Sequence, residues 1–365
     1  MKNSIFINQM EPWIGSEEKK AVSDYLGSGG WLTEFKKTRE FEQQIADYVG
    51  TKYCSVVNNG TISLSIALWI LGIKNEDEVI VPDYTMIASA NSVILAGAKP
   101  ILVDIDKKNL CLDFESTKKA VTKKTKAIIL VTINGRCPEI EKFVDFCRVK
   151  NIFLVEDSAQ SLGSRYKGKH LGTFGDVGSF SFSMPKIITT GQGGCLVTDS
   201  EELYKKISKI KDFGREAPGV DYHPTIGFNF KFTDLQAVIG IEQMKKLAWR
   251  VKRKKEMFKL YKGLLSNTKG IEFIETDLEN TSPWFIDILV ERHKREKLIN
   301  FLKEKGVGSR PFYPAIHTQL PYNNANGNFK NSEEISEKGL WLPSSSFLKD
   351  EQIKYITKTI KSFYD

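Results

Sequence analysis

The residues whose types and spacing could carry chemistry gather first in Gly178 to Gly194, which reads GSFSFSMPKIITTGQGG. Ser179 to Ser183 alternates hydroxyl and aromatic side chains, and this alternation predicts a half-buried strand. Pro185 cannot donate to a sheet, so Lys186 falls on the loop beyond that strand. A lysine there can lose its charge by desolvation and become a nucleophile that forms a Schiff base. The alternative for any single lysine is a solvated surface charge.

A second candidate is the turn Asn58-Asn59-Gly60-Thr61, which lies between an apolar run and a segment rich in Ile, Leu and Ala. Gly60 permits a tight turn, and Thr61 with the N–H groups after it would begin a helix. The start of a helix is a favourable place for a phosphate group. A helix cap that binds nothing is the alternative.

A third candidate is the acidic pair Glu156-Asp157, which follows the very apolar run Ile152 to Val155. A carboxylate at the carboxyl end of a buried parallel strand points into the ligand crevice, where it needs a cationic partner. Capping of a helix by Asp157 is the alternative. Together the three stretches predict a pocket for pyridoxal 5'-phosphate (PLP), in which Lys186 is the acid-base group. The predicted contacts are Asp157 with the pyridinium nitrogen, Gln160 with the ring hydroxyl, Gly60, Thr61 and Ser181 with the phosphate, and Lys186 with the aldehyde carbon.

The elements that must position these residues are short apolar runs separated by helix-length stretches. Helices are expected at Thr61 to Leu71, Met86 to Leu95 and Pro138 to Lys150. Strands separated by helices imply crossover connections and a mostly parallel sheet covered on both faces, the architecture of an α/β protein. Ligands are then expected beyond the carboxyl ends of the strands. The predicted strands are Tyr53 to Val57, Glu78 to Val81, Pro100 to Val103, Lys126 to Val131, Ile152 to Val155, Gly178 to Phe182 and Gly194 to Thr198.

The pattern changes near residue 240, which predicts two domains. Residues 1–240 are expected to form an N-terminal arm, with helical periodicity in Glu17 to Leu26 and Thr38 to Tyr48, and a large α/β domain. Residues 241–365 are expected to form a smaller α+β domain. Its predicted elements are strands Ile271 to Ile274 and Trp284 to Leu289, helix Arg295 to Lys305, the run Gly308 to Tyr313 and a terminal helix from Lys349.

Composition excludes several classes of function. The chain has 53 Lys and Arg against 45 Asp and Glu, a net charge of +8, and much of the excess lies in Lys245 to Lys262. That run predicts a solvated helix face, with a surface for anionic ligands as the alternative, and binding to nucleic acid is not expected without a matching motif. The five cysteines have no CxxC pairing and the four histidines are scattered, so neither a disulfide framework nor a metal site is predicted. Without an apolar signal region or a membrane-spanning run, a reduced, soluble, cytoplasmic protein is expected.

Several longer motifs resemble the sugar aminotransferases of the DegT/StrS type. They are the run EVIVPDYTMIASANSVILAGAKPILVDID from Glu78 to Asp106, VEDSAQSLGSRYKGKHLGTFGD, FSFSMPK and TTGQGG, and the resemblance extends from about Trp13 to Ile360. It implies fold type I, dependence on PLP with pyridoxamine phosphate as an intermediate form, and amination of nucleotide-linked keto-sugars, usually with glutamate as donor. Family members that act as dehydratases have histidine in place of the lysine, so Lys186 argues for transamination.

The resemblance also assigns roles to individual residues. The run Gly227 to Asp234 resembles a segment that reaches into the pocket of the neighbouring subunit, where Asn229 would contact the phosphate. The resemblance therefore implies a homodimer with composite active sites. The contacts within one chain carry over with Lys186 as the Schiff-base lysine, Asp157 as the pyridinium partner, Gln160 as the ring-hydroxyl contact and Ser181 as the phosphate-binding serine.

Two departures from the family pattern affect the pocket. Met86 stands where the family usually stacks an aromatic ring on the cofactor, and its thioether can still pack against the pyridine face. Val131-Thr132-Ile133-Asn134-Gly135 occupies a place where a His and a Tyr are common. Polar groups near the cofactor or the substrate are therefore changed, and either substrate choice or activity could differ.

Within the family, VDYHPTIGFNFKFTDLQAVIGIEQMKKL and SRPFYPAIHTQLPY look most like perosamine-synthase-type enzymes. Those enzymes aminate C4 of a nucleotide-linked 4-keto-6-deoxyhexose, usually for O-antigen lipopolysaccharide or other surface glycans. Arg310 is a predicted diphosphate contact, because a guanidinium fork suits two phosphate oxygens, with a surface ion pair as the alternative. His317, Trp31 and Tyr84 are further predicted substrate contacts, with packing roles as the alternative.

Two other functions stay open at this point. A C3-specific aminotransferase acting on a nucleotide-linked 3-keto-6-deoxyhexose would use the same cofactor site, because the regiochemistry depends on how the hexose is turned. A catalytically silent, cofactor-binding scaffold or regulator would keep the fold, but the intact set Lys186, Asp157, Gln160 and Ser181 weighs against it. The sequence leaves the nucleotide open among GDP, dTDP and UDP.

Overall fold

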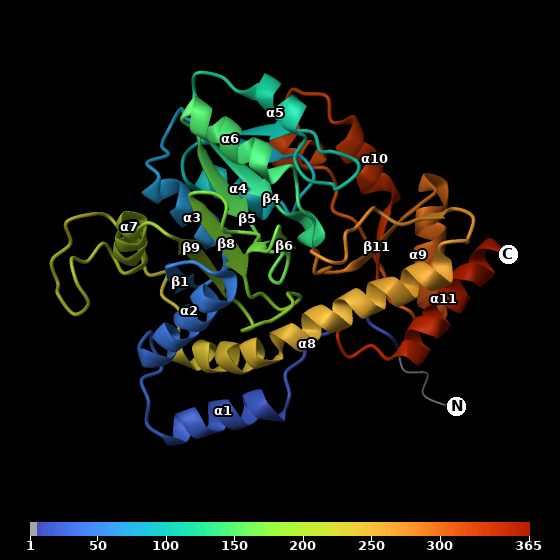
Figure 1. Cartoon of the computed structure of the whole chain (residues 1–365), viewed down its shortest axis with the longest axis horizontal. Coiled ribbons are helices and arrows are strands. Elements are labelled where there is room, and N and C mark those ends of the chain that lie inside the picture. The colour runs from blue at the N-terminus through green and yellow to red at the C-terminus, as the bar shows by residue number, and fades with distance from the viewer. Residues whose placement is uncertain (1–5) are drawn as a thin grey trace.

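The computed structural model describes residues 6–365, so the first five residues of the predicted arm lie outside it. Its centre is a seven-stranded sheet in which β9 runs antiparallel to both neighbours and the other pairs are parallel (Figure 1). The predicted α/β fold with a mostly parallel sheet of seven strands is confirmed. In spatial order the strands are β1 (Tyr53–Val57), β9 (Gly194–Thr198), β8 (Val177–Ser181), β5 (Phe153–Asp157), β4 (Thr125–Val131), β2 (Glu78–Pro82) and β3 (Lys99–Val103).

Helices cover both faces of this sheet, because successive side chains along each buried strand point to opposite sides. In β4, Ile129 joins the apolar cluster formed with α3 (Gly60–Ile70) and α4 (Ala88–Leu95). The preceding Ile128 joins the opposite cluster, formed with α6 (Ile140–Lys150). The sheet is thus an inner layer whose strand ends, and not its faces, are open to a ligand.

The expectation of a half-buried strand before Lys186 is wrong. Ser179 and Phe180 of β8 are both buried. Ser179 Oγ lies 2.5 Å from Ser63 Oγ of α3, whereas Phe180 packs in the cluster that contains Phe41 of α2 (Lys36–Val49). The alternation of hydroxyl and aromatic residues therefore reflects packing against α3 on one face and against α2 on the other, and Ser179 and Phe180 are both shielded from solvent.

The C-terminal lobe carries a four-stranded antiparallel sheet in the order β10-β11-β13-β12. The predicted strands and helices of this lobe are present, although β10 and β12 are shorter than expected. The sequence does not predict β13 or α10. The elements are β10 (Ile271–Glu272), β11 (Ile286–Val290), α9 (Arg295–Glu304), β12 (Arg310–Pro311), α10 (Lys330–Lys338), β13 (Gly339–Leu342) and α11 (Asp350–Tyr364).

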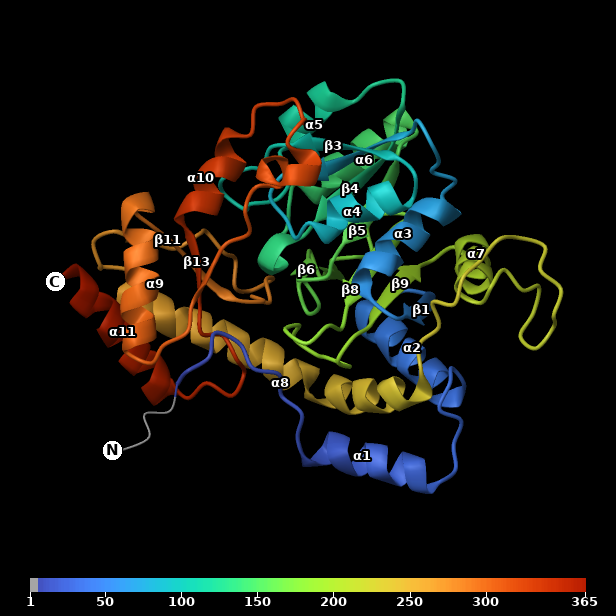
Figure 2. The same cartoon turned by 180° about the vertical axis from the view of Figure 1, so that it is seen from behind.

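Helix α8 (Asp234–Leu265) runs beneath both lobes and connects them (Figure 1, Figure 2). The predicted domain boundary between residues 240 and 241 falls inside this helix, and the two-domain division stays a prediction. The solvated face predicted for Lys245 to Lys262 is wrong at two positions, because Arg250 and Lys254 are only 2% and 0% exposed. These two cations point into the molecule, Arg250 toward the loop after Lys186 and Lys254 toward Trp284 and Ser344.

The N-terminal arm does not remain with the large sheet. Ile7 pairs in parallel with Val307 and is buried in the apolar cluster of the C-terminal lobe. The chain then returns to helix α1 (Ser16–Gly27), which lies beneath α8 (Figure 1). Within residues 6–365, no helix is both long and apolar enough to cross a lipid bilayer. The remaining elements are α5 (Phe114–Ala120), α7 (Glu201–Lys211) and the hairpin of β6 (Arg165–Tyr166) and β7 (Lys169–His170).

A buried ion pair joins the two lobes. Arg136, which follows β4, holds Asp287 of β11 in a bidentate pair, with Nη1–Oδ2 and Nη2–Oδ1 both 2.7 Å. The Asn134 amide donates a further hydrogen bond to Asp287 Oδ2 at 2.7 Å, and Arg136 Nη2 also donates to Thr276 Oγ1 at 2.9 Å. A buried pair is tolerated when its remaining donors and acceptors are satisfied in this way.

Asp287→Ala should lower the free energy of unfolding by about 3–5 kcal/mol, because it leaves the Arg136 guanidinium buried without a counter-charge. Urea unfolding followed by circular dichroism measures the change. Asp145→Ala is the matched control, because it breaks an exposed ion pair with Arg148 and should cost much less. Equal losses in the two variants would contradict the role assigned to the buried pair.

Candidate active site

Lys186 lies where the sequence predicts, on the loop that follows the carboxyl end of β8. Its side chain is half-buried, and Nζ lies 4.2 Å from the centre of the Trp284 ring. Burial lowers the pKa of Lys186 to about 8, and the attraction of Asp157 opposes that shift. The amine is therefore partly neutral near pH 8, which is the form that a nucleophile requires.

Asp157 is the last residue of β5, the strand beside β8. Its carboxylate accepts hydrogen bonds from Ser89 Oγ at 2.7 Å and from the Ala159 N–H at 3.2 Å. Burial raises the pKa of Asp157, although these bonds and the Lys186 charge favour the ionised form. The residues after Asp157 form turns, so the alternative of a helix cap is wrong.

Glu156 points to the opposite face of the sheet, as the alternation of side chains along a strand requires. Its carboxylate accepts the N–H groups of Gly172, Phe174 and Gly175 at 2.7, 2.5 and 2.7 Å. These bonds fix the turn that leads into β8. The two neighbouring acids therefore divide their roles, with Glu156 shaping the chain and Asp157 facing the pocket.

Gln160 presents its side-chain amide to the same pocket. Its Oε1 accepts the Asn134 N–H at 2.7 Å, which orients the amide and leaves the NH₂ group for a ligand. A small cavity in front of it is lined by Ser181, Lys186 and Trp284 among others. The structure thus brings Gln160, from the turn after Asp157, together with Ser181 and Lys186, from the stretch Gly178 to Gly194.

A cradle suited to phosphate lies at the start of α3. Asn59 caps this helix by accepting the Ile62 N–H at 2.9 Å. The first N–H groups of a helix have no acceptor within it, so those of Gly60 and Thr61 are placed for an anion. A Cβ on Gly60 would lie 2.9 Å from Ser181 Cβ, so glycine is what lets the helix start approach this serine.

These groups fit PLP at three points. The cradle between Gly60 and Ser181 suits the phosphate, the Asp157 carboxylate suits the ring nitrogen, and the Lys186 amine suits the aldehyde. Burial pushes both Lys186 and Asp157 toward their neutral forms, so both gain from a ligand that brings complementary charge. The residues present can therefore hold this cofactor.

The two departures from the family pattern lie beside this pocket. Met86 is 44% exposed and begins the turn into α4, where its carbonyl accepts the Ser89 N–H at 3.1 Å. Because Ser89 also contacts Asp157, the thioether stands near the ring site, and its contact with the cofactor stays a prediction. Thr132 is buried and donates to Ser161 Oγ at 2.7 Å, so it supports the turn after Asp157.

Asn229 lies on the loop of residues 212–233, which projects beyond α7 at the edge of the molecule (Figure 1). Its side chain is exposed, and its backbone forms an antiparallel bridge with Asp212. The next residue, Phe230, accepts the Asn58 N–H at 3.2 Å, so the loop returns beside the cradle of its own chain. The phosphate contact of Asn229 in a neighbouring subunit stays a prediction.

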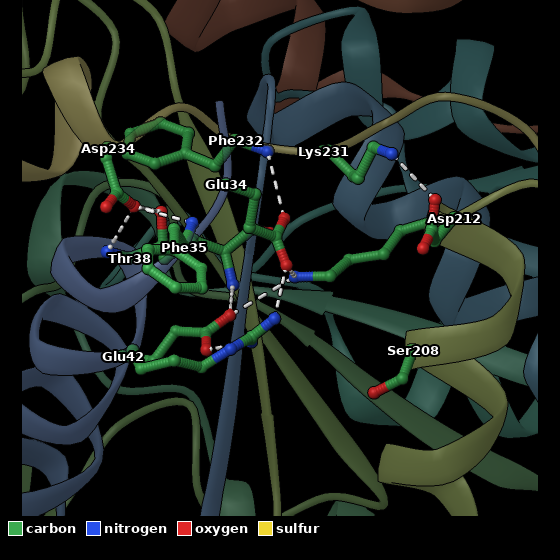
Figure 3. A network of polar contacts seen from close by, with 12 residues as sticks. Glu34, Phe35, Thr38, Glu42, Ser208, Asp212, Lys231, Phe232 and Asp234 are labelled. Carbon is green, nitrogen blue, oxygen red and sulfur yellow. Dashed lines mark hydrogen bonds and ion pairs between the residues drawn. The ribbon is translucent and has the colours of Figure 1, made fainter. Parts of the chain in front are cut away.

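A buried charge cluster anchors the base of this loop (Figure 3). Lys211, at the end of α7, pairs with Glu34 at 3.1 Å and with Glu42 at 3.2 Å, and Arg39 pairs with both carboxylates. Asp234, at the start of α8, accepts hydrogen bonds from the beginning of α2. The two cations balance the two glutamates, and the network ties the segment before α2 to the loop.

Two predicted substrate contacts are aromatic and lie in very different surroundings. Trp31 is 65% exposed in the connection before α2, where it stacks on Phe35 with ring centres 5.2 Å apart. Tyr84 is buried and packs beside Phe312 at 5.8 Å. Tyr84 is therefore enclosed by its own chain and Trp31 is open to a contact outside it, and the substrate contacts of both residues stay predictions.

The other two predicted substrate contacts lie in the C-terminal lobe. Arg310 is exposed, and its guanidinium lies 5.6 Å from the Tyr313 ring. His317 is held by two carboxylates, with Nδ1 2.7 Å from Asp83 Oδ2 and Nε2 3.2 Å from Glu333 Oε1. A sugar contact by His317 would therefore require Glu333 to release Nε2, while Arg310 is free to meet a phosphate.

Three residues of the pocket do not follow from the sequence. Ser89 donates to Asp157, Trp284 covers Lys186, and burial raises the pKa of Tyr313 to about 12, with the Asp157 charge adding to the effect. Ser89 lies inside a helix of small residues, and the two aromatic residues stand in apolar surroundings. Each pattern predicts core packing, so only the fold reveals that they face the pocket.

Comparison with known proteins identifies relatives of the whole chain. Residues 12–361 match the DegT/DnrJ/EryC1/StrS aminotransferase family. The GDP-perosamine synthases of Escherichia coli O157:H7 and Vibrio cholerae are 34% and 33% identical to this chain, covering 98% and 97% of it and 99% and 98% of their own lengths. The PMP form of the putative sugar aminotransferase Spr1654 from Streptococcus pneumoniae superposes with a TM-score of 0.92 at 28% identity, covering 98% of this chain and 97% of that one.

In the cofactor-free protein, the Lys186 amine should react with a small acylating reagent half-maximally near pH 8, because burial disfavours the ammonium form. Asp157→Asn should move this midpoint to lower pH, since the substitution removes an attraction that favours the ammonium. Peptide mass spectrometry across a pH series measures both midpoints. Identical pH profiles at Lys186 and at the exposed Lys150 would contradict the assigned environment.

Proposed function

Because this chain belongs to the DegT/DnrJ/EryC1/StrS aminotransferase family, which depends on PLP, we propose that it transfers an amino group from glutamate to C4 of a nucleotide-linked 4-keto-6-deoxyhexose. The product is the 4-amino-4,6-dideoxy sugar on the same nucleotide. The observation that carries the proposal is the buried Lys186 amine beside the Asp157 carboxylate, in a chain that aligns almost end to end with GDP-perosamine synthases.

The residues of the pocket divide the work of this reaction. Bound PLP supplies an electron sink that lets a proton leave the carbon next to the amino nitrogen. Lys186 moves that proton, first as base and then as acid, and a pKa near 8 suits both directions. Asp157, which Ser89 orients, would hold a proton on the ring nitrogen, and Gln160, which the Asn134 N–H orients, would hold the ring hydroxyl. Gly60, Thr61 and Ser181 would bind the phosphate.

Amination at C4 is supported by the resemblance to perosamine-synthase-type enzymes and by the names of the two relatives. Arg310 is exposed and can bind the diphosphate of a nucleotide sugar through bidentate hydrogen bonds from its guanidinium group. The product would supply O-antigen lipopolysaccharide or another surface glycan. Five free cysteines suit a reaction carried out in the reducing cytoplasm.

The active form is a homodimer in which Asn229 of each copy reaches the phosphate of the other. Two exposed segments support this assembly, because large apolar side chains gather on them and a second copy would remove them from water. The charge cluster of Glu34 and Lys211 holds the two segments against each other (Figure 3). The apolar side chains are Leu26, Trp31, Leu32 and Phe35 before α2, and Phe213, Val220, Tyr222, Ile226 and Phe228 on the loop.

A substrate panel tests the reaction. The PLP-loaded protein and glutamate are incubated with GDP-, dTDP- and UDP-linked 4-keto-6-deoxyhexoses and with a dTDP-linked 3-keto isomer, and products are identified by mass and NMR. An amine at C4 of one nucleotide sugar is expected. An amine at C3 would overturn the proposed regiochemistry in favour of a 3-aminotransferase, and no amine from any of the four would count against this substrate class.

Subunit mixing tests the composite site. Lys186→Ala and Asn229→Ala are each expected to be nearly inactive, whereas mixed dimers should regain activity, because the site with an intact lysine receives Asn229 from the other copy. Random mixing should restore about one quarter of the sites, since half of the dimers are mixed and each has one complete site. Demonstrated mixed dimers without activity would place Asn229 in its own chain's site and contradict the proposal.

A further inference from the structure

The two buried cations of α8, Arg250 and Lys254, have no part in the chemistry described so far. Within residues 6–365, neither forms an ion pair with a carboxylate, although both are almost fully buried. Burial lowers the pKa of Lys254 to about 7 and that of Arg250 to about 10. A buried cation without a contacting counter-charge is costly, so its hydrogen bonds indicate what it does.

Arg250 holds the chain that follows Lys186. Its Nη1 donates to the Ile187 carbonyl at 2.7 Å and to Gln243 Oε1 at 2.6 Å. The same Gln243 oxygen accepts the Thr189 N–H at 3.2 Å. The backbone from Ile187 to Thr189 is therefore fixed by side chains from one face of α8.

Lys254 acts on the chain that precedes Lys186, and it does so through Trp284. Its Nζ donates to the Trp284 carbonyl at 2.9 Å and also to the Ser344 carbonyl. The Trp284 indole Nε1 donates to the Pro185 carbonyl at 2.8 Å, and its ring lies over the Lys186 amine. The carbonyls on both sides of Lys186 are thus held by groups that α8 fixes.

We propose that Arg250 and Lys254 are positioning residues for Lys186, with Arg250 acting directly on the loop and Lys254 acting through Trp284. A side chain that moves a proton at a substrate carbon needs a fixed backbone, because small displacements cost large factors in rate. Trp284 has the second task of covering the amine against water. This inference rests on the proposed role of Lys186.

The Lys186 amine itself reports on this arrangement. Asp157 from β5 is the charged group that acts on this amine, Tyr313 from the C-terminal lobe responds to the same Asp157 charge, and Lys254 lies behind Trp284. Removing the Trp284 ring lets water reach the Lys186 amine, which should raise the pKa of the amine from about 8 toward the ordinary value of about 10.4. The attraction of the ring for an ammonium acts in the opposite direction, whereas burial is the larger of the two causes that set the pKa of this amine, the other being the charge of Asp157.

The test compares pH profiles of Lys186 acylation in cofactor-free Trp284→Ala, Lys254→Met and the double variant. Each single substitution should raise the midpoint by about one pH unit, as expected when a buried amine regains water. The double variant should shift no further than Trp284→Ala alone, because Lys254 acts through that residue. Methionine fills the space of the lysine stem and removes the charge together with its hydrogen bonds to the Trp284 and Ser344 carbonyls.

Trp284→Phe keeps a ring over the amine but loses the bond to Pro185, so its midpoint should lie between those of the parent protein and Trp284→Ala. Lys252→Met is the control, because Lys252 lies on the same helix and its side chain is exposed. It should leave the profile unchanged. An unshifted midpoint in Lys254→Met, or shifts that add in the double variant, would overturn the inference.

Hydrogen exchange of the cofactor-free protein tests Arg250 separately. Arg250→Met should speed exchange in the peptide that covers residues 187–190, where the Thr189 N–H is held, and leave β11 unchanged. Unchanged exchange at residues 187–190 would contradict the role of Arg250. The acylation and exchange measurements need neither PLP nor a sugar. Their results can therefore contradict the roles of Arg250 and Lys254 while the substrate panel supports the proposed reaction, or support those roles while the panel contradicts it.

Discussion

Loss of water at the carboxyl edge of the central sheet is the constraint on which the rest of the structure depends. The edge places an amine and a carboxylate, Lys186 and Asp157, where desolvation moves their pKa values in opposite directions. Neither charge is stable there alone, so the pocket favours a ligand that carries complementary charges. The start of α3 at Gly60 then offers a place for phosphate without burying another cation.

Charged groups elsewhere in the interior meet the same constraint by different means. Arg136 and Asp287 satisfy each other in a bidentate pair and so join the lobes. Glu34 and Lys211 belong to a balanced cluster that holds an exposed loop. Within residues 6–365, Arg250 and Lys254 have no carboxylate partner, and they donate instead to carbonyl oxygens that include those of Ile187 and Trp284. Paired charges therefore maintain the architecture, and the two cations without an ion pair lie beside the chemistry.

The strands of the central sheet could be predicted to within two residues, because buried parallel strands are short apolar runs bounded by turn residues. The place of Lys186 on the loop after β8 could also be predicted, because Pro185 cannot donate a hydrogen bond to the sheet. The burial of Lys254 could not be predicted, since a lysine-rich helix shows the same pattern whichever cation it turns inward. The four residues of β13 are too few to show a period, and the crossing of Ile7 to the C-terminal lobe depends on Val307, far along the chain.

Covalent capture of the cofactor tests most directly whether Lys186 is the amine on which the pocket is built. Borohydride reduction of the PLP-loaded protein links the cofactor permanently to the amine that holds it, and peptide mass spectrometry locates the added mass. One adduct on the peptide containing Lys186, absent from Lys186→Ala, is the result that the structure predicts. An adduct on another lysine, such as the buried Lys254, would contradict the assignment of the active site.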